Sequence, residues 1–217
     1  MARTCIDHIV VTARSLESGA AHVRDALGVS LQAGGEHPRM ATHNLLLRLG
    51  DDRFLEVIAP NPAVAAPTRP RWFALDTLGP DAAPSLSMWV VRTSDVRGVA
   101  RASAEPLGPI EPMHRGTLDW HITIPADGSV PLDGVAPALI EWGTPVHPAA
   151  RLEDRGVALE TLEIVHPDPD RVSRLLQSLA FDGPVQVRRA EAGVPPHLVA
   201  HLDTPLGRRR LSCRDRP

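Results

Sequence analysis

Three residues with ionisable side chains stand out because each lies in an apolar, strand-like stretch of the sequence. His8 lies near the N-terminus, Glu56 lies in segment 53–59, and Glu141 lies in segment 138–142. A carboxylate in such surroundings can act as a general base. An imidazole together with carboxylates also suits a borderline divalent ion such as Zn²⁺, Fe²⁺, Mn²⁺ or Ni²⁺. These residue types therefore indicate proton transfer or metal binding. The alternative is that His8 is a hydrogen-bonded strand histidine in a pocket without metal.

The patterns around these residues predict a strand, a helix and three further strands in the first part of the chain. β-branched residues make segment 5–12 strand-like. Apolar residues at helical spacing predict a helix over 16–27, with Ser15 as its N-cap and Gly28 as its C-cap. Short strands are expected at 29–32, 42–49 and 53–59.

The same order of elements returns further along the chain. In the second part we expect a helix over 95–104, capped by Ser94, among strands at 86–92, 118–124 and 138–142. In the third part we expect a helix over 171–179, with strands at 159–165, 185–189, 197–202 and 208–213. The chain is therefore predicted to belong to the α+β class.

An internal similarity supports duplication of one module. Residues 53–60 and 138–145 both place a glutamate within an apolar strand, followed by a proline four positions later. The spacing of about 80 residues is too long for a solenoid repeat. We expect a first βαβββ module at 1–62, a proline-rich surface connector at 63–84, a second module at 85–150 and a third, partial module at 151–217.

Composition excludes several classes of function. The net charge is −3, and all 23 basic residues are arginines interspersed with acids, so no nucleic-acid-binding surface is expected. No apolar run is long enough to span a membrane, and no signal peptide is recognisable, so we expect a cytoplasmic protein. The sequence contains no nucleophile elbow or P-loop, and the Gly34-Gly35 pair alone is too weak to indicate a dinucleotide site.

Several motifs, in the right order, resemble the glyoxalase-like domain family of the vicinal oxygen chelate superfamily. The resemblance implies repeated βαβββ modules whose curved mixed sheets form a cup around a ligand, usually with a divalent metal. It covers nearly the whole chain but does not imply a particular reaction. The motifs are Ile6-Asp7-His8-Ile9-Val10-Val11, the stretch from Gly34 to Asn44 that leads into Phe54-Leu55-Glu56, the Trp120 segment, and Ile140-Glu141-Trp142 followed by His147-Pro148.

The resemblance also implies a set of metal ligands. Strand alternation places His8, Val10 and Thr12 on one face of the first strand and Asp7 on the other. His8 and Glu56 are then expected to point into the cup, with Glu141 as a third ligand from the second module; the two glutamates are also the candidate catalytic bases. The fourth ligand of the family pattern is missing, because Ser87 and Met88 stand near its place. The site is therefore either a three-ligand metal centre or a site without metal.

Four further residues are expected to contact a small-molecule substrate. His37 and Asn44 lie where the resemblance places the rim of the cup. Arg115 precedes a strand and can bind an anionic group through two hydrogen bonds. Trp120 is a candidate ligand platform, although tryptophans are more often part of a core.

Two functions remain open. One is a metal-dependent lyase, isomerase or dioxygenase that acts on a small oxygen-rich molecule. The alternative is a metal-free protein that binds or sequesters a small molecule in the same cup. The absent fourth ligand favours the second function, and the resemblance leaves an enzyme slightly favoured. We further expect a homodimer, with no nucleic-acid or membrane partner.

Overall fold

The computed structural model describes residues 2–144 and 146–213. Pro145, the proline of the second repeated motif, lies outside the described residues. The first module has the predicted order of elements, but its second strand begins at Gln32 and includes Gly34 and Gly35, so the strand expected at 29–32 was wrong. The elements are β1 (Cys5–Thr12), α1 (Leu16–Leu27), β2 (Gln32–His37), the 3-10 turn η1 (Pro38–Met40), β3 (Thr42–Arg48) and β4 (Phe54–Pro60).

Helix α1 begins and ends at the predicted residues because the Ser15 side chain caps its first turn and the backbone of Gly28 ends its last turn. The hydroxyl of Ser15 accepts a hydrogen bond from the backbone N–H of Ser18 at 3.2 Å. Gly28 has a φ of 73°, the left-handed conformation that favours glycine at a helix end. Val23 and Leu27 are fully buried and attach the helix to the outer face of the sheet.

The second module repeats the order strand, helix and three strands. Its helix is shorter than predicted and is capped by Asp95, whose carboxylate accepts from Gly98 N, and not by Ser94. A further strand, over 110–115, was not among the predicted strands. The elements are β5 (Ser85–Arg92), α2 (Val96–Ala102), β6 (Ile110–Arg115), β7 (Leu118–Thr123), the short turn α3 (Pro131–Gly134) and β8 (Ala138–Trp142).

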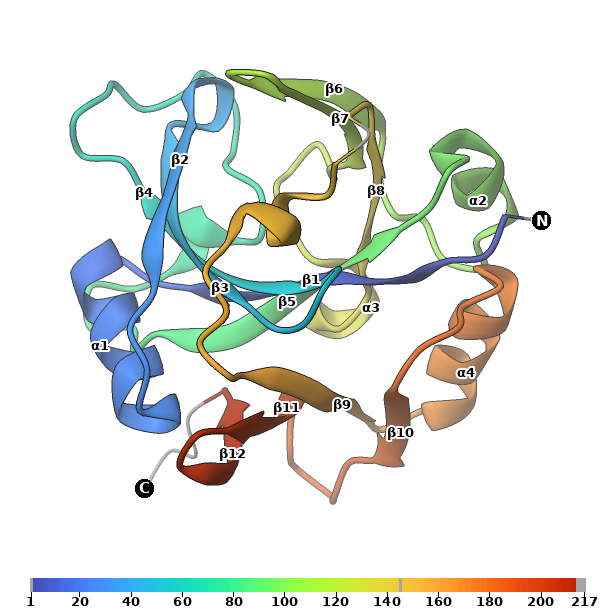
Figure 1. Cartoon of the computed structure of the whole chain (residues 1–217). Coiled ribbons are helices and arrows are strands. Elements are labelled where there is room, and N and C mark those ends of the chain that lie inside the picture. The colour runs from blue at the N-terminus through green and yellow to red at the C-terminus, as the bar shows by residue number, and fades with distance from the viewer. Residues whose placement is uncertain (1, 145, 214–217) are drawn as a thin grey trace.

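The two modules share one sheet of eight strands, in the order β2-β3-β4-β1-β5-β8-β7-β6. β1 and β5 pair antiparallel at its centre, while β4 and β8 run parallel to β1 and β5 respectively. The outer strands curve up on either side of β1 and β5 until β2 and β6 meet (Figure 1). The predicted fold, curved mixed sheets around a cup, is confirmed.

The last part of the chain forms a second sheet, in the order β10-β9-β11-β12. Its first strand pairs in parallel with the strand that follows the helix, whereas β1 and β5 pair with the last strand of their modules. The third unit thus has the order of elements of the other two but a different strand topology. Its elements are β9 (Ala158–His166), α4 (Pro169–Ser178), β10 (Val185–Arg189), β11 (His197–Thr204) and β12 (Gly207–Ser212), after the 3-10 turn η3 (Pro148–Arg151).

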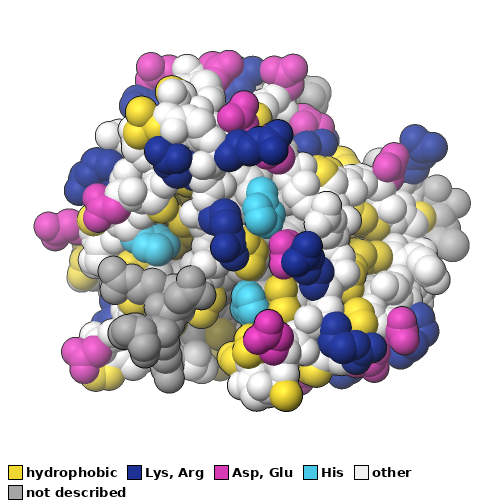
Figure 2. Space-filling model, turned by 90° about the horizontal axis from the view of Figure 1, so that it is seen from below, with side chains coloured by type: hydrophobic (Ala, Val, Ile, Leu, Met, Phe, Trp, Pro, Cys, Tyr) yellow, Lys and Arg dark blue, Asp and Glu magenta, His cyan; other side chains and the backbone are white. Residues whose placement is uncertain are grey.

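The second sheet lies below the large sheet and between α1 and α4 (Figure 1). β11 and β12 contact β5, and β12 contacts α1. Seen from below, the surface shows arginine, histidine and acidic side chains close to one another (Figure 2). On β12, Arg208 pairs with Glu160 at 3.1 Å, and on β10, Arg188 pairs with Glu163 at 3.6 Å.

The large sheet separates two hydrophobic cores. On its outer face, Ile9, Leu55 and Trp89 pack with the helices and with the second sheet. On its cup face, Val10 and Ile58 pack with residues of the second module and of the segment that joins the modules. The cup is therefore filled largely by side chains, and only part of it remains as a pocket.

The proline-rich connector contributes to the cup as well as to the surface. Val64 is exposed, as expected of a surface connector. Trp72, Phe73 and Leu75, however, are buried and belong to the cup-side core. Leu75 is the first residue of the 3-10 turn η2 (Leu75–Thr77). Phe73 has a φ of 58°, a conformation that bulky residues rarely adopt. Burial of the two aromatic rings stabilises this turn against the backbone strain.

Among the described residues, no helix is long and apolar enough to cross a membrane.

Candidate active site

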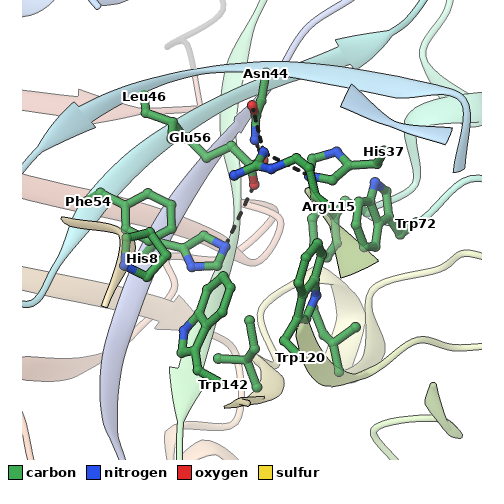
Figure 3. A pocket seen from close by; sticks show the side chains of 14 residues that line it. His8, His37, Asn44, Leu46, Phe54, Glu56, Trp72, Arg115, Trp120 and Trp142 are labelled. Atoms are coloured by element: carbon green, nitrogen blue, oxygen red, sulfur yellow. Dashed lines mark hydrogen bonds and ion pairs between the residues drawn. The ribbon is translucent and has the colours of Figure 1, made fainter. Parts of the chain in front are cut away.

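The pocket lies inside the cup, where both modules contribute side chains. β1 and β4 supply His8, Phe54 and Glu56, and β3 supplies Asn44 (Figure 3). The second module and the connector supply most of the aromatic wall. The remaining lining residues are His37, Leu46, Trp72, Phe73, Arg115, Trp120, Ile122, Ile140, Trp142 and Pro148.

A β-bulge at Asp7 determines the polar chemistry of the pocket. The register between β1 and β5 shifts there, since Ile6 pairs with Val91 and His8 pairs with Val90. Ile6 and Ile9 lie in the outer core, so Asp7 and His8 both turn toward the cup side. A bulge redirects side chains in this way because two residues on one strand oppose one on its partner. The expectation that Asp7 lies on the face opposite to His8 was therefore wrong.

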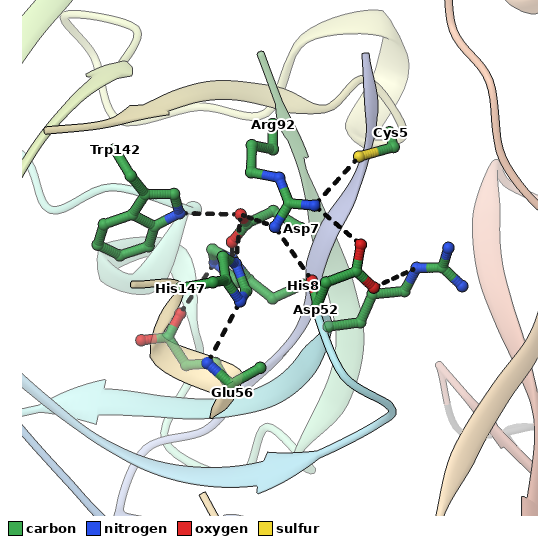
Figure 4. A network of polar contacts seen from close by, with 10 residues as sticks. Cys5, Asp7, His8, Asp52, Glu56, Arg92, Trp142 and His147 are labelled. Carbon is green, nitrogen blue, oxygen red and sulfur yellow. Dashed lines mark hydrogen bonds and ion pairs between the residues drawn. The ribbon is translucent and has the colours of Figure 1, made fainter. Parts of the chain in front are cut away.

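The carboxylate of Asp7 is fully buried and accepts hydrogen bonds from three rings (Figure 4). His8 Nδ1 lies 2.6 Å from Oδ1, and both Trp142 Nε1 and His147 Nε2 lie 2.9 Å from Oδ2. The guanidinium of Arg92 is 3.9 Å away. Burial by itself raises the pKa of Asp7, but the hydrogen bonds from His147 and His8 outweigh it and hold the pKa below its usual range. Asp7 is therefore a carboxylate at neutral pH.

Hydrogen bonding to Asp7 fixes the orientation of the His8 ring. Because a carboxylate only accepts, His8 Nδ1 must carry the hydrogen, and Nε2 is directed to the pocket. Phe54 stacks on the ring, with centroids 4.4 Å apart and planes inclined by 13°. His8 Nε2 lies 3.7 Å from Oε2 of Glu56, which is too long for a hydrogen bond. The ring is thus held on one side and free to react on the other.

Glu56 is held by Asn44, which is fixed in turn by the backbone of β2. Asn44 Nδ2 donates to Oε1 of Glu56 at 2.5 Å, and Asn44 Oδ1 accepts from the N–H of Gly35 at 2.7 Å. A Cβ atom on Gly34 would lie 2.1 Å from Asn44 Oδ1, so only glycine leaves room for this arrangement. Oε2 of Glu56 remains without a hydrogen-bond partner among the described residues.

Arg115 reaches the pocket from the end of β6. Its Nη1 donates to His37 Nε2 at 3.4 Å and to Asn44 Oδ1 at 3.3 Å, both weak contacts. Burial lowers the pKa of Arg115, and the charge of Glu56 opposes this effect, so the guanidinium remains charged at neutral pH. No described carboxylate lies within ion-pair distance of it, and its Nε and Nη2 atoms have no hydrogen-bond partner in the described part of the chain.

His37 is neutral for a clear physical reason. Its burial, followed by the positive charge of Arg115, lowers the pKa of His37 to about 3. Since Nε2 accepts from Arg115, Nδ1 carries the hydrogen and donates to the hydroxyl of Thr42 at 3.1 Å. His37 thus supports Arg115 as an acceptor and is not a candidate acid at neutral pH.

The structure brings most of the predicted site residues together. His8, Glu56, His37, Asn44, Arg115 and Trp120 all line the pocket. Glu141 does not, because alternation along β8 directs Ile140 and Trp142 to the pocket and Glu141 to the opposite face. There, Oε2 of Glu141 accepts from the backbone N–H of Val96 at the start of α2, at 2.8 Å. The expected convergence of His8, Glu56 and Glu141 is therefore not seen.

These residues do not fit a catalytic metal centre of the usual kind. Such a centre needs about three protein ligands and one open position. His8 and Glu56 provide two donors, the carboxylate of Glu141 is bound at a helix N-terminus, and the described residues contain no cluster of three or more histidine, cysteine or acidic side chains that could hold an ion. The fixed positive charge beside Glu56 belongs to Arg115. We therefore derive no step through a metal.

Asp7 and His147 are the site residues that the sequence interpretation missed. Asp7 was assigned to the outer face by regular alternation, and the bulge is not visible in the sequence. His147 looked structural or exposed, whereas it is only 13% exposed and donates to Asp7. One signal was present: an aspartate next to a histidine within an otherwise apolar strand leaves an acid that must be paired if it is buried.

A nearly closed sheet of two βαβββ modules around an inward-facing pocket defines the vicinal oxygen chelate fold. The chain belongs to the family of the glyoxalase-like domain, whose model matches residues 6–180. This match extends from β1 through α4 and therefore includes both modules. No curated protein matches the chain.

Several solved structures are similar to this chain at low sequence identity. A hypothetical protein from Staphylococcus aureus is 12% identical, with a TM-score of 0.59, over 87% of this chain and 86% of that chain. A mutant of 4-hydroxymandelate synthase from Streptomyces coelicolor is 19% identical, with a TM-score of 0.50, over 98% of this chain and 63% of that chain. Methylmalonyl-CoA epimerase from Streptomyces coelicolor, in complex with 2-nitronate-propionyl-CoA, is 18% identical, with a TM-score of 0.45, over 64% and 97%. At such identities the likeness concerns the fold and not the activity.

Proposed function

We propose that this protein is an enzyme that binds a small oxygen-rich molecule in the cup and transfers a proton with His8 as the base. The observation that carries the proposal is the 2.6 Å contact between His8 Nδ1 and Asp7 Oδ1. A buried carboxylate that holds one ring nitrogen leaves the other nitrogen as a positioned base.

The proposed step is a proton abstraction of the isomerase or lyase type. A C–H bond of the substrate breaks, an N–H bond forms at His8 Nε2, and the electron pair stays on the substrate as an enolate. Asp7 stabilises the imidazolium that forms, since it is already ionised and within hydrogen-bond distance. Arg115 is the group on the cup wall that can stabilise negative charge on a substrate oxygen. The proton then returns from Nε2 to the carbon that lost it, which restores the C–H bond and the free base.

The competing function is binding without chemistry, in a protein that sequesters or senses a small molecule. The observation that favours it is the lack of a third metal ligand in the pocket, because Glu141 is bound to the start of α2. Both functions use the same cup. They differ only in whether a bound molecule exchanges protons with the protein.

Proton exchange with solvent tests the proposal directly. The protein is incubated in D₂O with a panel of small hydroxycarbonyl compounds, hydroxy acids and oxo acids, and the loss of C–H signals is followed by NMR. We expect exchange of at least one compound, slowed by about 10²-fold or more in His8→Asn. The matched control is His201→Asn, which removes a histidine from the second sheet, where it pairs with Glu163. Binding of a compound without any exchange would contradict the proposal and support the sequestering function.

A further inference from the structure

Two polar atoms face each other in the pocket without a hydrogen bond between them. His8 Nε2 and Glu56 Oε2 are 3.7 Å apart, and neither has another partner among the described residues. The other polar atom of each side chain is occupied, His8 Nδ1 by Asp7 and Glu56 Oε1 by Asn44. Both residues are buried and line the pocket, so a polar group of a ligand in the pocket can reach these atoms. A ligand hydroxyl suits the pair, because it donates its hydrogen to Glu56 Oε2 and can accept from His8 Nε2 once the imidazole is protonated.

Arg115 presents a second unsatisfied group to the same pocket. Only Nη1 has contacts, and these are long, at 3.3 and 3.4 Å. Nε and Nη2 lie on one edge of the guanidinium plane and form the fork that binds a carboxylate through two parallel hydrogen bonds. No carboxylate of the described chain occupies it.

The backbone of β2 is adapted to the position of Arg115. A Cβ atom on Gly35 would lie 2.8 Å from Cδ and 3.1 Å from Nε of Arg115. Any other residue at this position would therefore push the guanidinium away. The neighbouring glycine makes room for Asn44 in the same manner. The Gly34-Gly35 pair, which carries no meaning as a nucleotide motif, thus has a local role in holding the polar groups of the pocket.

The size of the pocket restricts the ligand. The free cavity among the lining residues measures about 30 Å³. A cavity that binds benzene measures about 150 Å³, whereas one water needs roughly 10–15 Å³. An aromatic or coenzyme-sized ligand would require the aromatic wall of Trp72, Trp120 and Trp142 to move. A molecule of a few heavy atoms fits with little rearrangement.

We infer that the cup takes a short-chain 2-hydroxy carboxylate, with its carboxylate on the Nε–Nη2 edge of Arg115 and its hydroxyl between His8 and Glu56. The inference rests on the proposed function for its choice of site and deepens it by naming the substrate class. The carbon that bears the hydroxyl then lies next to His8 Nε2, where the proposed proton transfer takes place. The carbon skeleton contacts the aromatic and aliphatic wall.

Calorimetric titration with three matched probes tests the substrate class independently of turnover. Glycolate carries both groups, acetate lacks the hydroxyl, and glycolamide lacks the negative charge. We expect glycolate to bind wild type at least tenfold more tightly than either of the others. Arg115→Gln lowers the affinity for glycolate to the level of glycolamide and leaves glycolamide binding unchanged. The control Arg188→Gln, on the second sheet, has no effect, and Arg115→Lys, which keeps the charge but not the fork, gives an intermediate affinity.

The outcomes distinguish this inference from the proposed function. Equal binding of glycolate and glycolamide, or equal affinities of Arg115→Gln and Arg188→Gln for glycolate, overturns the carboxylate assignment. If neutral hydroxycarbonyl compounds then still exchange protons through His8, the base role stands and only the substrate class fails. Conversely, wild type that binds glycolate with the expected preference supports the substrate class even if no exchange is found. Circular dichroism and thermal unfolding confirm that Arg115→Gln is folded, and Arg115→Lys replaces it if it is not.

Discussion

Asp7 and His8 are neighbours in strand β1, yet their side chains meet, with Asp7 Oδ1 2.6 Å from His8 Nδ1. Neighbours in a regular strand point to opposite faces. The contact exists because the bulge between Ile6 and His8 turns Asp7 to the cup side. Trp142 and His147 then close around the same carboxylate from the second module and the segment after it. The base of the proposed reaction is thus fixed by a local irregularity of one strand.

Replacing the buried carboxylate is expected to release the His8 ring. In Asp7→Asn one of the two acceptor positions becomes a donor, so His8 or the pair of Trp142 and His147 loses its partner. We expect a loss of stability of about 1–3 kcal/mol, as for a buried donor left without its acceptor, and loss of the single His8 tautomer. Urea unfolding and ¹⁵N NMR of the histidine rings measure the two effects. Asp52→Asn, which removes a half-exposed partner of Arg92, is the control; an unchanged His8 tautomer in Asp7→Asn would contradict the assignment.

His37 is expected to make stability fall in mild acid. Its folded-state pKa of about 3 lies below the unfolded value of 6.5, so unfolding takes up a proton when the pH is below 6.5. Its contribution is fully present above pH 6.5 and is lost as the pH falls toward 3. Between pH 7 and pH 5 it amounts to about 2 kcal/mol. Urea unfolding at both pH values should show that the free energy of unfolding falls more between pH 7 and pH 5 in wild type than in His37→Gln. An equal fall in the two proteins would show that His37 is not held neutral.

The space beside Gly35 can be filled without replacing any polar side chain of the pocket. In Gly35→Ala the added methyl group meets the Arg115 side chain at 2.8 Å. We expect the affinity for glycolate to fall several-fold while the free energy of unfolding changes by less than about 1 kcal/mol, since the neighbour is a flexible side chain. Gly79→Ala is the matched control, because a Cβ atom there meets nothing within 4 Å. Unaltered glycolate affinity in Gly35→Ala would argue against the placement of Arg115.

Glu141 is expected to act on stability and not on the site. Its carboxylate accepts from Val96 N at the first turn of α2, where a negative group stabilises a helix. Glu141→Ala should lower the free energy of unfolding by about 1 kcal/mol, as for the loss of a helix cap. Ligand affinity and proton exchange should not change, and titration calorimetry with NMR checks both. A loss of ligand affinity or of proton exchange in Glu141→Ala, without a change in the free energy of unfolding, would show that Glu141 acts in the site.

Metal content is expected to be well below one equivalent. His8 and Glu56 supply only two donors, so an ion would be weakly held. Elemental analysis of protein purified without an affinity tag or chelator gives the measurement, before and after incubation with Zn²⁺, Mn²⁺, Fe²⁺ and Ni²⁺. His8→Ala and Glu56→Ala provide the comparison. Near-stoichiometric metal in wild type that disappears in both variants would restore the metal-dependent function considered from the sequence.

The sequence by itself determined the architecture of the large sheet and most residues of the pocket. Ser15 and Gly28 predict where the helix at Leu16–Leu27 begins and ends, because capping depends on nearby residues only. His8, Glu56 and Asn44 could be assigned to the cup because strand alternation is a local rule, once the resemblance had placed the strands. Arg115 was predicted from its residue type, as a guanidinium that can bind an anionic group through two hydrogen bonds.

The tertiary structure decided which of these groups work together. Glu141 faces away from the pocket because the register of β8 directs Ile140 and Trp142 inward, and register is set by pairing with distant strands. The contacts of Asp7 depend on a bulge and on His147, which is 140 residues away in the sequence. Pairing register, bulges and contacts between modules arise from packing of the whole chain, and no window of sequence contains them. The sequence determined the cup and several of the residues that line it, and packing between the modules decided that Glu141 faces away and that Asp7 holds the His8 ring.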